Sequence, residues 1–334
     1  MEEIIVKYLD IKSGKDILTV SKIALGTDYF GTTVSEETAF RMLDMYVDAG
    51  GNCIDTARIY ASWLPGGDGA SERTIGKWLK TRGGRNRVLL STKGGHPPLA
   101  QMNRGRLSGR EIEADLDESL RTLGTDVIDL YWLHRDDVSH PVEDILDTMS
   151  VLVGKGKIRA FGCSNWRTER IEEANRKAGL VSSKEPTASN GFCASQIQWS
   201  LASSMPELHG DPTIVCMNEK EYDWYEREKF PVFAFSAQAK GFFARASAKG
   251  LEAVNKKAAE RFATPENIAR LERVKEYAAR SGLTPSAVAL GYITCNPVPA
   301  VAIIGCKNEE QLTDSLTASD AELSREDTNW LLRG

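Results

Sequence analysis

The sequence holds few of the residues from which disulfides or metal sites are built. Its 334 residues include six cysteines and four histidines. The cysteines lie far apart without a CxxC pair, mostly inside apolar runs, where a thiol behaves as a small hydrophobic group. A reducing compartment is therefore expected. Among the histidines only His134 is predicted to end a strand, which disfavours a metal-dependent hydrolase and predicts no metal site.

Long hydrophobic runs and an excess of positive charge are also missing. No stretch approaches the roughly 20 apolar residues that a membrane-spanning helix needs. The first residues, Met1–Glu3, are acidic, and no long apolar core follows them, so no secretory signal is expected. The formal net charge of −5 provides no field for holding a polyanion. These absences predict a cytoplasmic protein without a membrane or nucleic-acid partner.

Short apolar runs alternate with longer amphipathic segments along most of the chain. A hairpin is predicted first, with strands at Ile4–Leu9 and Ile17–Ser21 around a turn at Ser13–Asp16. Eight apolar runs that read as strands follow, starting near Ile23, Asn52, Val88, Val127, Ile158, Ser195, Val232 and Val298. Strand and helix in eightfold alternation is typical of a closed parallel barrel.

The segments between these runs show helical periodicity. The clearest are Glu36–Gly50, Ser71–Thr81, Ser108–Leu123, Val142–Gly154, Arg167–Ala178 and Glu266–Ser281. Long connections follow the sixth and seventh strands, and the second contains a Gly/Ala/Lys-rich loop expected at Lys240–Lys249. We predict an α/β fold: one (β/α)8 TIM-barrel domain over residues 1–334, with an N-terminal hairpin. Periodicity alone leaves a doubly wound sheet open.

Ionisable side chains interrupt the apolar runs where neighbouring strands end. Asp55 ends the second run, Tyr60 follows it after a short turn, Lys93 ends the third run and His134 the fourth. The carboxyl ends of barrel strands share one rim, where active sites of this fold lie. A lysine beside a phenol is expected to lower its pKa from about 10, and an aspartate keeps the lysine charged. A histidine can orient a carbonyl oxygen toward the phenol, so the set could protonate an alkoxide.

These four residues resemble, in order and spacing, the catalytic tetrad of the aldo-keto reductase superfamily, in its bacterial type. The similarity extends over nearly the whole chain. Gly50–Ala57 is similar to the segment around the family's aspartate, and Ser71–Gly76 to the opening of its second helix. The resemblance implies an NADP(H)-dependent oxidoreductase that reduces an aldehyde or ketone, sugar-derived ones included, with Tyr60 as general acid/base. A nucleotide-binding regulatory barrel with little turnover stays open as the alternative.

The sequence has no GxGxxG after its first strand, so the nucleotide must be held in another way than in a Rossmann fold. The resemblance implies a dinucleotide extended across the barrel mouth. Ser164, Asn165 and Gln196 would hydrogen-bond the nicotinamide carboxamide. The resemblance adds three further cofactor-binding residues, which are Gly26, Thr27 and Asp55.

The remaining cofactor contacts are expected after the last two strands. Phe235 would stack on the nicotinamide. The residues that would wrap the pyrophosphate are Ser236, Ala237, Gln238, Lys240, Gly241 and Phe242, with Ala237 where the family commonly has proline. The residues expected at the 2′-phosphate are Gly305, Cys306 and Lys307, and those at the adenine are Gln311, Asp314 and Ser315. Gln311 and Ser315 stand where arginine and asparagine are frequent, so Lys307 is the main cation, which favours NADP(H) and leaves NAD open.

Aromatic and cationic residues near the strand ends are candidates for a substrate pocket. They are Tyr29, Trp63, Trp132, Arg135 and Trp166. Such side chains at a barrel mouth could orient a small carbonyl or alcohol substrate. The identity of that substrate is not encoded in the pattern, and a homo-oligomer is left open.

Overall fold

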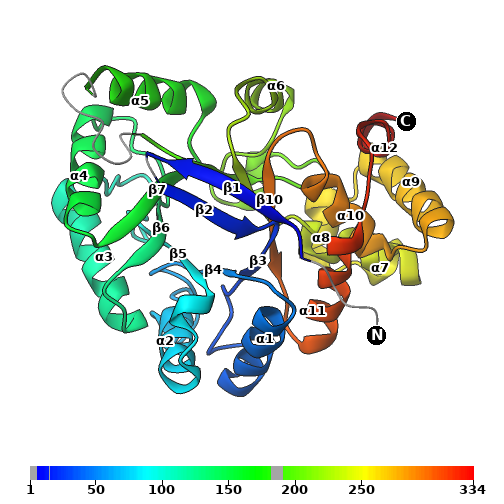
Figure 1. Ribbon diagram of the computed structural model, residues 1–334. Helices are drawn as coiled ribbons and strands as arrows, with labels where there is room; N and C mark the ends of the chain where they lie inside the picture. Colours follow the sequence, from blue (N-terminus) through cyan, green and yellow to red (C-terminus); the bar gives the residue numbers. More distant parts are fainter. Residues whose placement is uncertain (1–5, 15, 182–190) are drawn as a thin grey trace.

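The computed structural model describes residues 6–14, 16–181 and 191–334. Parallel strands close into a barrel in the order β10-β3-β4-β5-β6-β7-β8-β9 (Figure 1). Their bounds are β3 Ile23–Gly26, β4 Cys53–Asp55, β5 Leu89–Gly94, β6 Ile128–Leu133, β7 Ile158–Ser164, β8 Ser195–Gln198, β9 Val232–Phe235 and β10 Ala300–Gly305. Because β10 pairs with both β9 and β3, the predicted barrel is confirmed and the doubly wound sheet is excluded.

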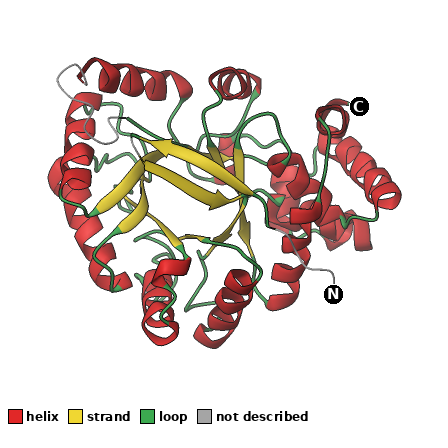
Figure 2. Ribbon diagram, in the orientation of Figure 1, coloured by secondary structure: helices red, strands yellow, loops and turns green. Residues whose placement is uncertain are grey.

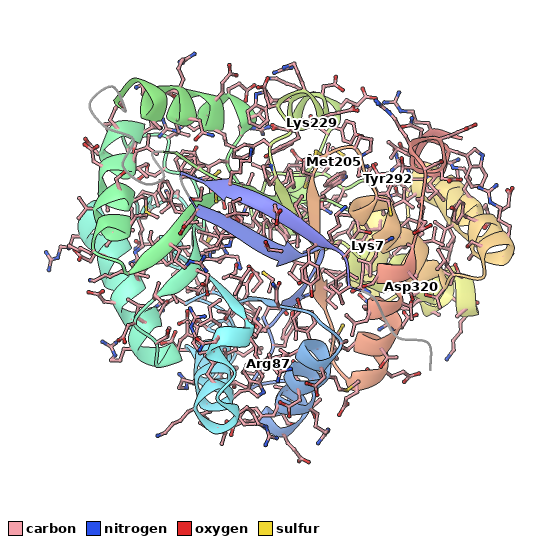
Figure 3. All side chains as sticks on the ribbon, viewed as in Figure 1. Lys7, Arg87, Met205, Lys229, Tyr292 and Asp320 are labelled. Atoms are coloured by element: carbon pink, nitrogen blue, oxygen red, sulfur yellow. The ribbon has the colours of Figure 1, made fainter. Side chains whose placement is uncertain are left out.

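Helices form a layer outside the barrel (Figure 2). Their bounds are α1 Glu36–Asp48, α2 Ala70–Arg82, α3 Gly109–Leu123, α4 Val142–Gly154, α5 Thr168–Val181, α6 Glu219–Glu228, α7 Phe242–Lys249, α8 Lys256–Phe262, α9 Pro265–Ser281, α10 Pro285–Thr294, α11 Glu309–Leu316 and α12 Arg325–Arg333. Side chains fill the interior as well as the surface (Figure 3). No helix in the described part of the chain is long and apolar enough to cross a membrane.

The N-terminal hairpin closes one end of the barrel. It consists of β1 Tyr8–Ser13 and β2 Asp16–Ser21, which pair antiparallel. The buried side chains of Ile11, Leu18 and Val20 belong to the same cluster as Trp132 and Phe233 of the barrel interior. Since β2 leads directly into β3, the hairpin lies at the amino ends of the strands. The carboxyl ends are thus left as the open rim.

The predicted bounds of the first strand were wrong. The prediction placed it at Ile4–Leu9, partly outside the described residues, whereas β1 begins at Tyr8. Register explains the difference, because Ile11 lies opposite Leu18 and both side chains are buried. Burial of this pair therefore determines where the strand lies. The prediction placed the strand too early because it relied on the apolar pair Ile4–Ile5.

The loop predicted at Lys240–Lys249 is also corrected, because most of it forms α7. Alanine, lysine and arginine favour a helix, and Phe242, Phe243 and Ala246 are its buried residues. Phe242 lies against Phe262 of α8, with ring centroids 6.5 Å apart. The segment is therefore packed onto the barrel rather than lying over it as an irregular loop.

We expect Leu18→Ala to lower the free energy of unfolding by about 2–5 kcal/mol, because it opens a cavity beneath the barrel core. Ile17→Ala is the matched control, since its side chain is 55% exposed whereas that of Leu18 is 1% exposed. Surface substitutions of this kind usually change stability by less than about 0.5 kcal/mol. Urea unfolding of both variants measures the difference, and equal losses would show that the hairpin does not plug the barrel.

Candidate active site

The barrel brings the predicted tetrad residues to one rim. Asp55 is the last residue of β4, Lys93 lies near the end of β5 and His134 directly follows β6. Tyr60 stands in the turns after β4, where its backbone N–H donates to the carbonyl of Ala57 at 3.0 Å. Strand register places Asp55 opposite Ser91 on β5. Lys93 lies two residues after Ser91, on the same face of β5, so the carboxylate and the lysine lie side by side.

The Lys93 ammonium is the centre of the site. Its Nζ donates to Asp55 Oδ2 at 2.6 Å, to the carbonyl of Thr56 at 2.7 Å and to Tyr60 Oη at 2.8 Å. An ammonium has three donors and no acceptor, so all three are used. The Tyr60 oxygen must accept in this pair, which leaves the phenol's own proton free for another acceptor.

The Asp55 carboxylate is oriented by further donors. Ser91 Oγ donates to Oδ1 at 2.8 Å, and Gln196 Nε2 donates to the same oxygen at 3.1 Å. Trp132 Nε1 donates to Ser91 Oγ at 2.7 Å. The side chains of Asp55 and Lys93 are each 1% exposed. A buried ion pair keeps its geometry when its remaining lone pairs are also satisfied, as they are here.

Burial shifts the pKa of both Tyr60 and Lys93. Burial first, and then the charges of Asp55 and Asp28, raise the pKa of the Tyr60 hydroxyl well above its ordinary value. The prediction of a lowered pKa was wrong in its net direction, because it counted the lysine and omitted burial and the carboxylates. Burial also lowers the pKa of the Lys93 ammonium, and the negative charge of Asp55 acts in the opposite direction. Tyr60 is therefore a protonated phenol at neutral pH, as a proton donor must be.

His134 is a neutral imidazole beside Tyr60. The two ring centroids are 6.0 Å apart. Burial, then His96 and Arg135, lower the pKa of His134 well below its ordinary value. Within the described residues its buried Nδ1 has no hydrogen-bond partner. A neutral imidazole can donate one hydrogen bond to a carbonyl oxygen at this position.

His96 is a second imidazole in the site, which the sequence prediction missed. Its ring centroid lies 4.7 Å from that of His134. His96 Nδ1 is 2.6 Å from the carbonyl oxygen of Pro97, so this nitrogen carries the proton. Burial is the largest cause that lowers the pKa of His96 to about 4. Both imidazoles are thus uncharged at neutral pH.

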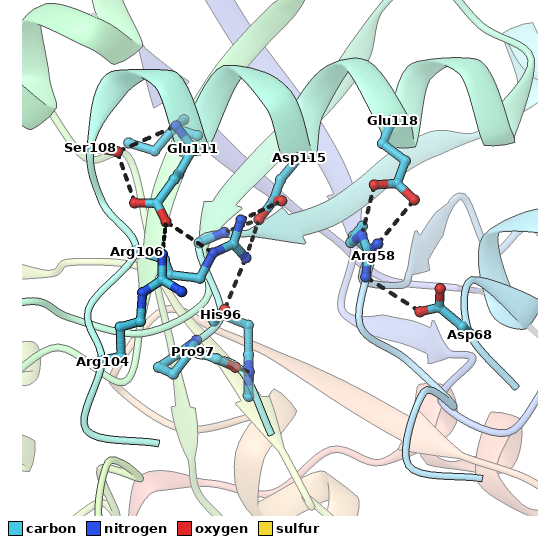
Figure 4. A network of polar contacts seen from close by, with 12 residues as sticks. Arg58, Asp68, His96, Pro97, Arg104, Arg106, Ser108, Glu111, Asp115 and Glu118 are labelled. Atoms are coloured by element: carbon cyan, nitrogen blue, oxygen red, sulfur yellow. Dashed lines mark hydrogen bonds and ion pairs between the residues drawn. The ribbon is translucent and has the colours of Figure 1, made fainter. Parts of the chain in front are cut away.

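Ion pairs on α3 hold the two loops that carry Tyr60 and His96 (Figure 4). Arg58 donates to both carboxylate oxygens of Glu118, at 3.0 and 3.1 Å. Arg106 binds Asp115 at 2.9 and 3.0 Å and also donates to the carbonyl of His96 at 3.0 Å. Two loops far apart in sequence are therefore fixed to one helix behind the site.

The residues expected at a carboxamide lie next to each other on β7 and β8. Ser164 and Gln196 are paired in register. Ser164 Oγ accepts from Asn165 Nδ2 at 3.0 Å, which leaves its own hydroxyl proton, while Gln196 uses Nε2 on Asp55 and retains its amide oxygen. One donor and one acceptor side by side complement a primary amide. Asn165 is otherwise occupied, since its Oδ1 accepts from the backbone N–H of Val215 at 3.1 Å.

The residues after β9 form an irregular turn that ends at a helix. Phe235 is the last strand residue and is partly buried. Positive φ angles occur at Ser236, Ala239, Lys240 and Gly241. Gly241 precedes α7, and no side chain caps that helix. Uncapped backbone N–H groups at a helix start suit a phosphate.

Some expected cofactor contacts are not available as side chains. Phe242 is fully buried in the core, so only its backbone lies at the turn. Ala237 and Thr27 are also fully buried. Ser315 is fully buried, accepts from Gln238 and donates to the carbonyl of Gln311, so its side chain does not border a surface site. Each was predicted from the resemblance to the family, which does not report the direction of a side chain.

The segment after β10 offers one exposed cation. Gly305 at the end of Ala300–Gly305 is exposed, and a Cβ added there would meet no atom within 4 Å. Lys307 is exposed, its backbone N–H donates to Gln311 Oε1 at 3.0 Å, and its Nζ lies 5.8 Å from the Tyr29 ring centroid. Cys306 is buried beside Ser315, and Asp314 is partly buried. Gly26 lies opposite Gly305 in register and opposite Asp55 on its other side.

Two of the five residues expected in the substrate pocket lie at the rim with Tyr60. Trp63 is 44% exposed and contacts the edges of both Tyr29 and Tyr60, at centroid distances of 6.2 and 6.3 Å. Tyr29 is partly buried. These aromatic rings form one wall beside the phenol.

The other three expected pocket residues are engaged elsewhere. Trp132 and Trp166 are fully buried: the first packs on Phe233 inside the barrel and the second on Phe192 outside it. The pocket interpretation of both tryptophans is therefore not supported. Arg135 is paired with Asp211 at 2.8 Å and donates to the carbonyl of His134.

The sequence reasoning also missed Asp28 and Ser91. Asp28 lies two residues after the end of β3 and directly before Tyr29, which was a predicted pocket residue. Burial is the largest cause that raises the pKa of the Asp28 carboxyl to about 6. Ser91 lies on β5, and its hydroxyl donates to Asp55 inside the barrel. A search for all polar residues at strand ends, beyond the tetrad pattern, would have found both.

Comparisons with known proteins agree with this geometry. Residues 22–331 match the model of the Aldo/keto reductase family. Norsolorinic acid reductase stcV of Emericella nidulans is 29% identical over 331 residues, covering 93% of this chain and 77% of that protein. The uncharacterized oxidoreductase YrpG of Bacillus subtilis is 30% identical over 324 residues, covering 94% and 91%. The crystal structure of an aldo-keto reductase from Klebsiella pneumoniae in complex with NADPH is similar with a TM-score of 0.67 at 26% identity, covering 98% of this chain and 95% of that chain.

Asp28→Asn is expected to stabilise the protein at pH 8 but not at pH 4. The folded-state pKa of about 6 lies above the ordinary value of 3.8, so the unfolded chain releases this proton first and stability falls as pH rises between the two. Removing the charge should recover about 1–3 kcal/mol above pH 6. Urea unfolding at both pH values measures this, with exposed Asp147→Asn as control. An equal effect at pH 4 and pH 8 would contradict it.

Proposed function

Since the chain belongs to the aldo/keto reductase family, we propose that this oxidoreductase reduces an aldehyde or ketone to an alcohol with NADPH, and that Tyr60 supplies the proton. The observation that carries the proposal is the hydrogen bond from Lys93 Nζ to Tyr60 Oη at 2.8 Å. It directs the phenol's own proton away from the lysine. The buried Asp55 keeps that lysine in place.

The residues present fit a nicotinamide dinucleotide. Ser164 and Gln196 offer a donor and an acceptor for the carboxamide, and the uncapped start of α7 offers backbone N–H groups for a phosphate. The similar Klebsiella structure contains NADPH. When bound, the dinucleotide would supply the hydride to the carbonyl carbon. The chain's own residues would supply the proton and hold the carbonyl oxygen in place.

The proton transfer follows from the hydrogen bonds of the site. Tyr60 donates its proton to the carbonyl oxygen as negative charge develops there, so that carbonyl, hydride and proton together give the alcohol. The phenolate that remains is stabilised by the adjacent Lys93 ammonium, which Asp55 neutralises in turn. The neutral His134 donates a hydrogen bond to the same oxygen and orients it. The proton on Tyr60 is then restored from solvent, since Tyr60 is only partly buried.

Lys307 supports NADPH over NADH. It is exposed beside Tyr29 at the start of the α11 segment, and no ion pair occupies it among the described residues. A free ammonium in this place can pair with a phosphate on the adenosine ribose.

Tyr60→Phe should lower kcat/KM for reduction by about 10²–10⁴-fold, because it removes the proton donor. The Kd for NADPH, measured by quenching of tryptophan fluorescence, should stay within about twofold, since the phenol is expected to contact substrate and not the dinucleotide. Stopped-flow or steady-state loss of NADPH absorbance with an aldehyde panel measures the rate.

Tyr8→Phe is the matched control for this change. Tyr8 lies on the hairpin at the opposite end of the barrel, where its hydroxyl donates to the carbonyl of Gly50 after α1. Turnover by Tyr60→Phe at the rate of the control would rule out Tyr60 as the donor. Tight NADPH binding by the unaltered protein without turnover of any carbonyl would instead favour a regulatory nucleotide-binding role.

Lys307→Ala should raise the Kd for NADPH by about 10-fold while changing that for NADH by less than about twofold, because it removes one charge-assisted contact to a phosphate. Lys12→Ala, an exposed lysine on β1, serves as the control. Fluorescence titration with both nucleotides gives the comparison. Equal weakening of NADPH and NADH would show that Lys307 does not read the 2′-phosphate.

A further inference from the structure

Asp28 is held firmly at the rim beside the tetrad. Its predecessor Thr27 donates to the carbonyl of Asp55 through both its backbone N–H, at 3.1 Å, and its Oγ1, at 2.9 Å. Thr27 also accepts from the backbone N–H of Phe30 at 3.0 Å, which closes a turn around Asp28 and Tyr29. The backbone of Asp28 is therefore fixed against the end of β4, next to the strand that carries Asp55.

The Asp28 carboxylate differs from the buried carboxylates of the barrel, because among the described residues only its own backbone N–H donates to it. Asp55, Asp115 and Asp129 each accept hydrogen bonds from at least two other residues. Asp28 is partly buried, yet among the described residues no other residue donates a hydrogen bond to its side chain and no ion pair reaches it. The nearby charges that act on it are Lys240, Lys93 and Asp55. Most of its acceptor capacity is therefore not used by other described residues.

The surroundings of this carboxylate are the aromatic wall of the rim. Asp28 directly precedes Tyr29 in the turn that Thr27 anchors to the end of β4. After burial, its charge is a further cause that raises the pKa of both Tyr29 and Tyr60, so the carboxylate lies near both rings. Trp63 contacts both rings at the edge. A purely apolar substrate in this space would cover an ionised acceptor without pairing it, which costs about 1–3 kcal/mol or more. A substrate with a donor group would satisfy it.

We propose that Asp28 determines specificity by accepting a hydrogen bond from a hydroxyl or ammonium group next to the reacting carbonyl. The substrate class is then hydroxylated or amino-substituted aldehydes and ketones. This assignment rests on the proposed reductase function, in which Tyr60 and His134 hold the carbonyl oxygen. The raised pKa of Asp28, about 6, leaves the carboxylate ionised at pH 7.5, where it accepts from either donor.

Three ketones of nearly equal size test the proposal: hydroxyacetone, aminoacetone and butanone. They place a hydroxyl, an ammonium or a methyl group on the same carbon. At pH 7.5 the unaltered protein should show kcat/KM for hydroxyacetone or aminoacetone at least about 10-fold above butanone, because a site built for a donor rejects the analogue that lacks it. The larger of the two ratios identifies which donor the site takes.

Asp28→Leu should bring both ratios to about one, since it removes the acceptor and keeps a similar volume. Asp28→Asn is the matched variant: its amide oxygen still accepts from a hydroxyl, so it should keep part of the hydroxyacetone ratio and lose the aminoacetone ratio. Near-ultraviolet circular dichroism and the Kd for NADPH check that both variants fold. A preference for butanone, or ratios unchanged in Asp28→Leu, would overturn the proposal.

Failure of the proposed function can be told apart from failure of this inference. Binding of the three ketones is measured without turnover, by the fluorescence of the protein, since Trp63 is exposed at the rim. If no carbonyl is reduced but hydroxyacetone or aminoacetone binds better than butanone in an Asp28-dependent manner, the reductase function fails and the specificity assignment stands. If carbonyls are reduced without any Asp28-dependent ratio, the assignment alone fails.

Discussion

A buried ammonium with three acceptors organises the rim of this barrel. Lys93 is almost fully buried, and burying its charge is tolerated because Asp55, Thr56 and Tyr60 accept all three of its hydrogen atoms. These contacts join β5 to β4 and to the turn that carries the phenol. Loss of the ammonium would leave a buried carboxylate unpaired, which costs several kcal/mol, about 3–5 in comparable buried pairs. The position of Tyr60 and the direction of its proton both follow from this pair.

The rest of the site keeps its reactive groups neutral and fixed. Burial opposes ionisation of Tyr60 and protonation of His134, so both side chains are neutral groups that can each donate a hydrogen bond. The loops that bear Tyr60 and His96 are tied to α3 by Arg58 and Arg106, which limits their movement during the reaction. Asp28 is the exception, an ionisable group at the rim to which no other residue in the described part of the chain donates a hydrogen bond.

Much of the fold and the site could be predicted because each depends on local order in the chain. The barrel followed from apolar runs alternating with amphipathic segments, and Asp55, Lys93 and His134 followed from polar residues where those runs end. The prediction failed where distant packing decides. Residues 240–249 were predicted as a loop, yet Phe242 and Phe243 of α7 are buried because α8, α9 and α10 pack beside that helix. Trp132 and Trp166 looked like pocket residues, but neighbours remote in sequence enclose them.

The sequence alone determined which chemical groups stand at the strand ends, because in a parallel barrel every strand exit reaches the same rim. It also determined the absence of a Rossmann phosphate loop, since that motif is continuous in the chain. Only the tertiary structure decided the direction in which the pKa of Tyr60 shifts and the hydrogen bond from Gln196 to Asp55. Burial, neighbouring charges and hydrogen-bond partners come from several strands, and these strands meet only once the barrel has closed.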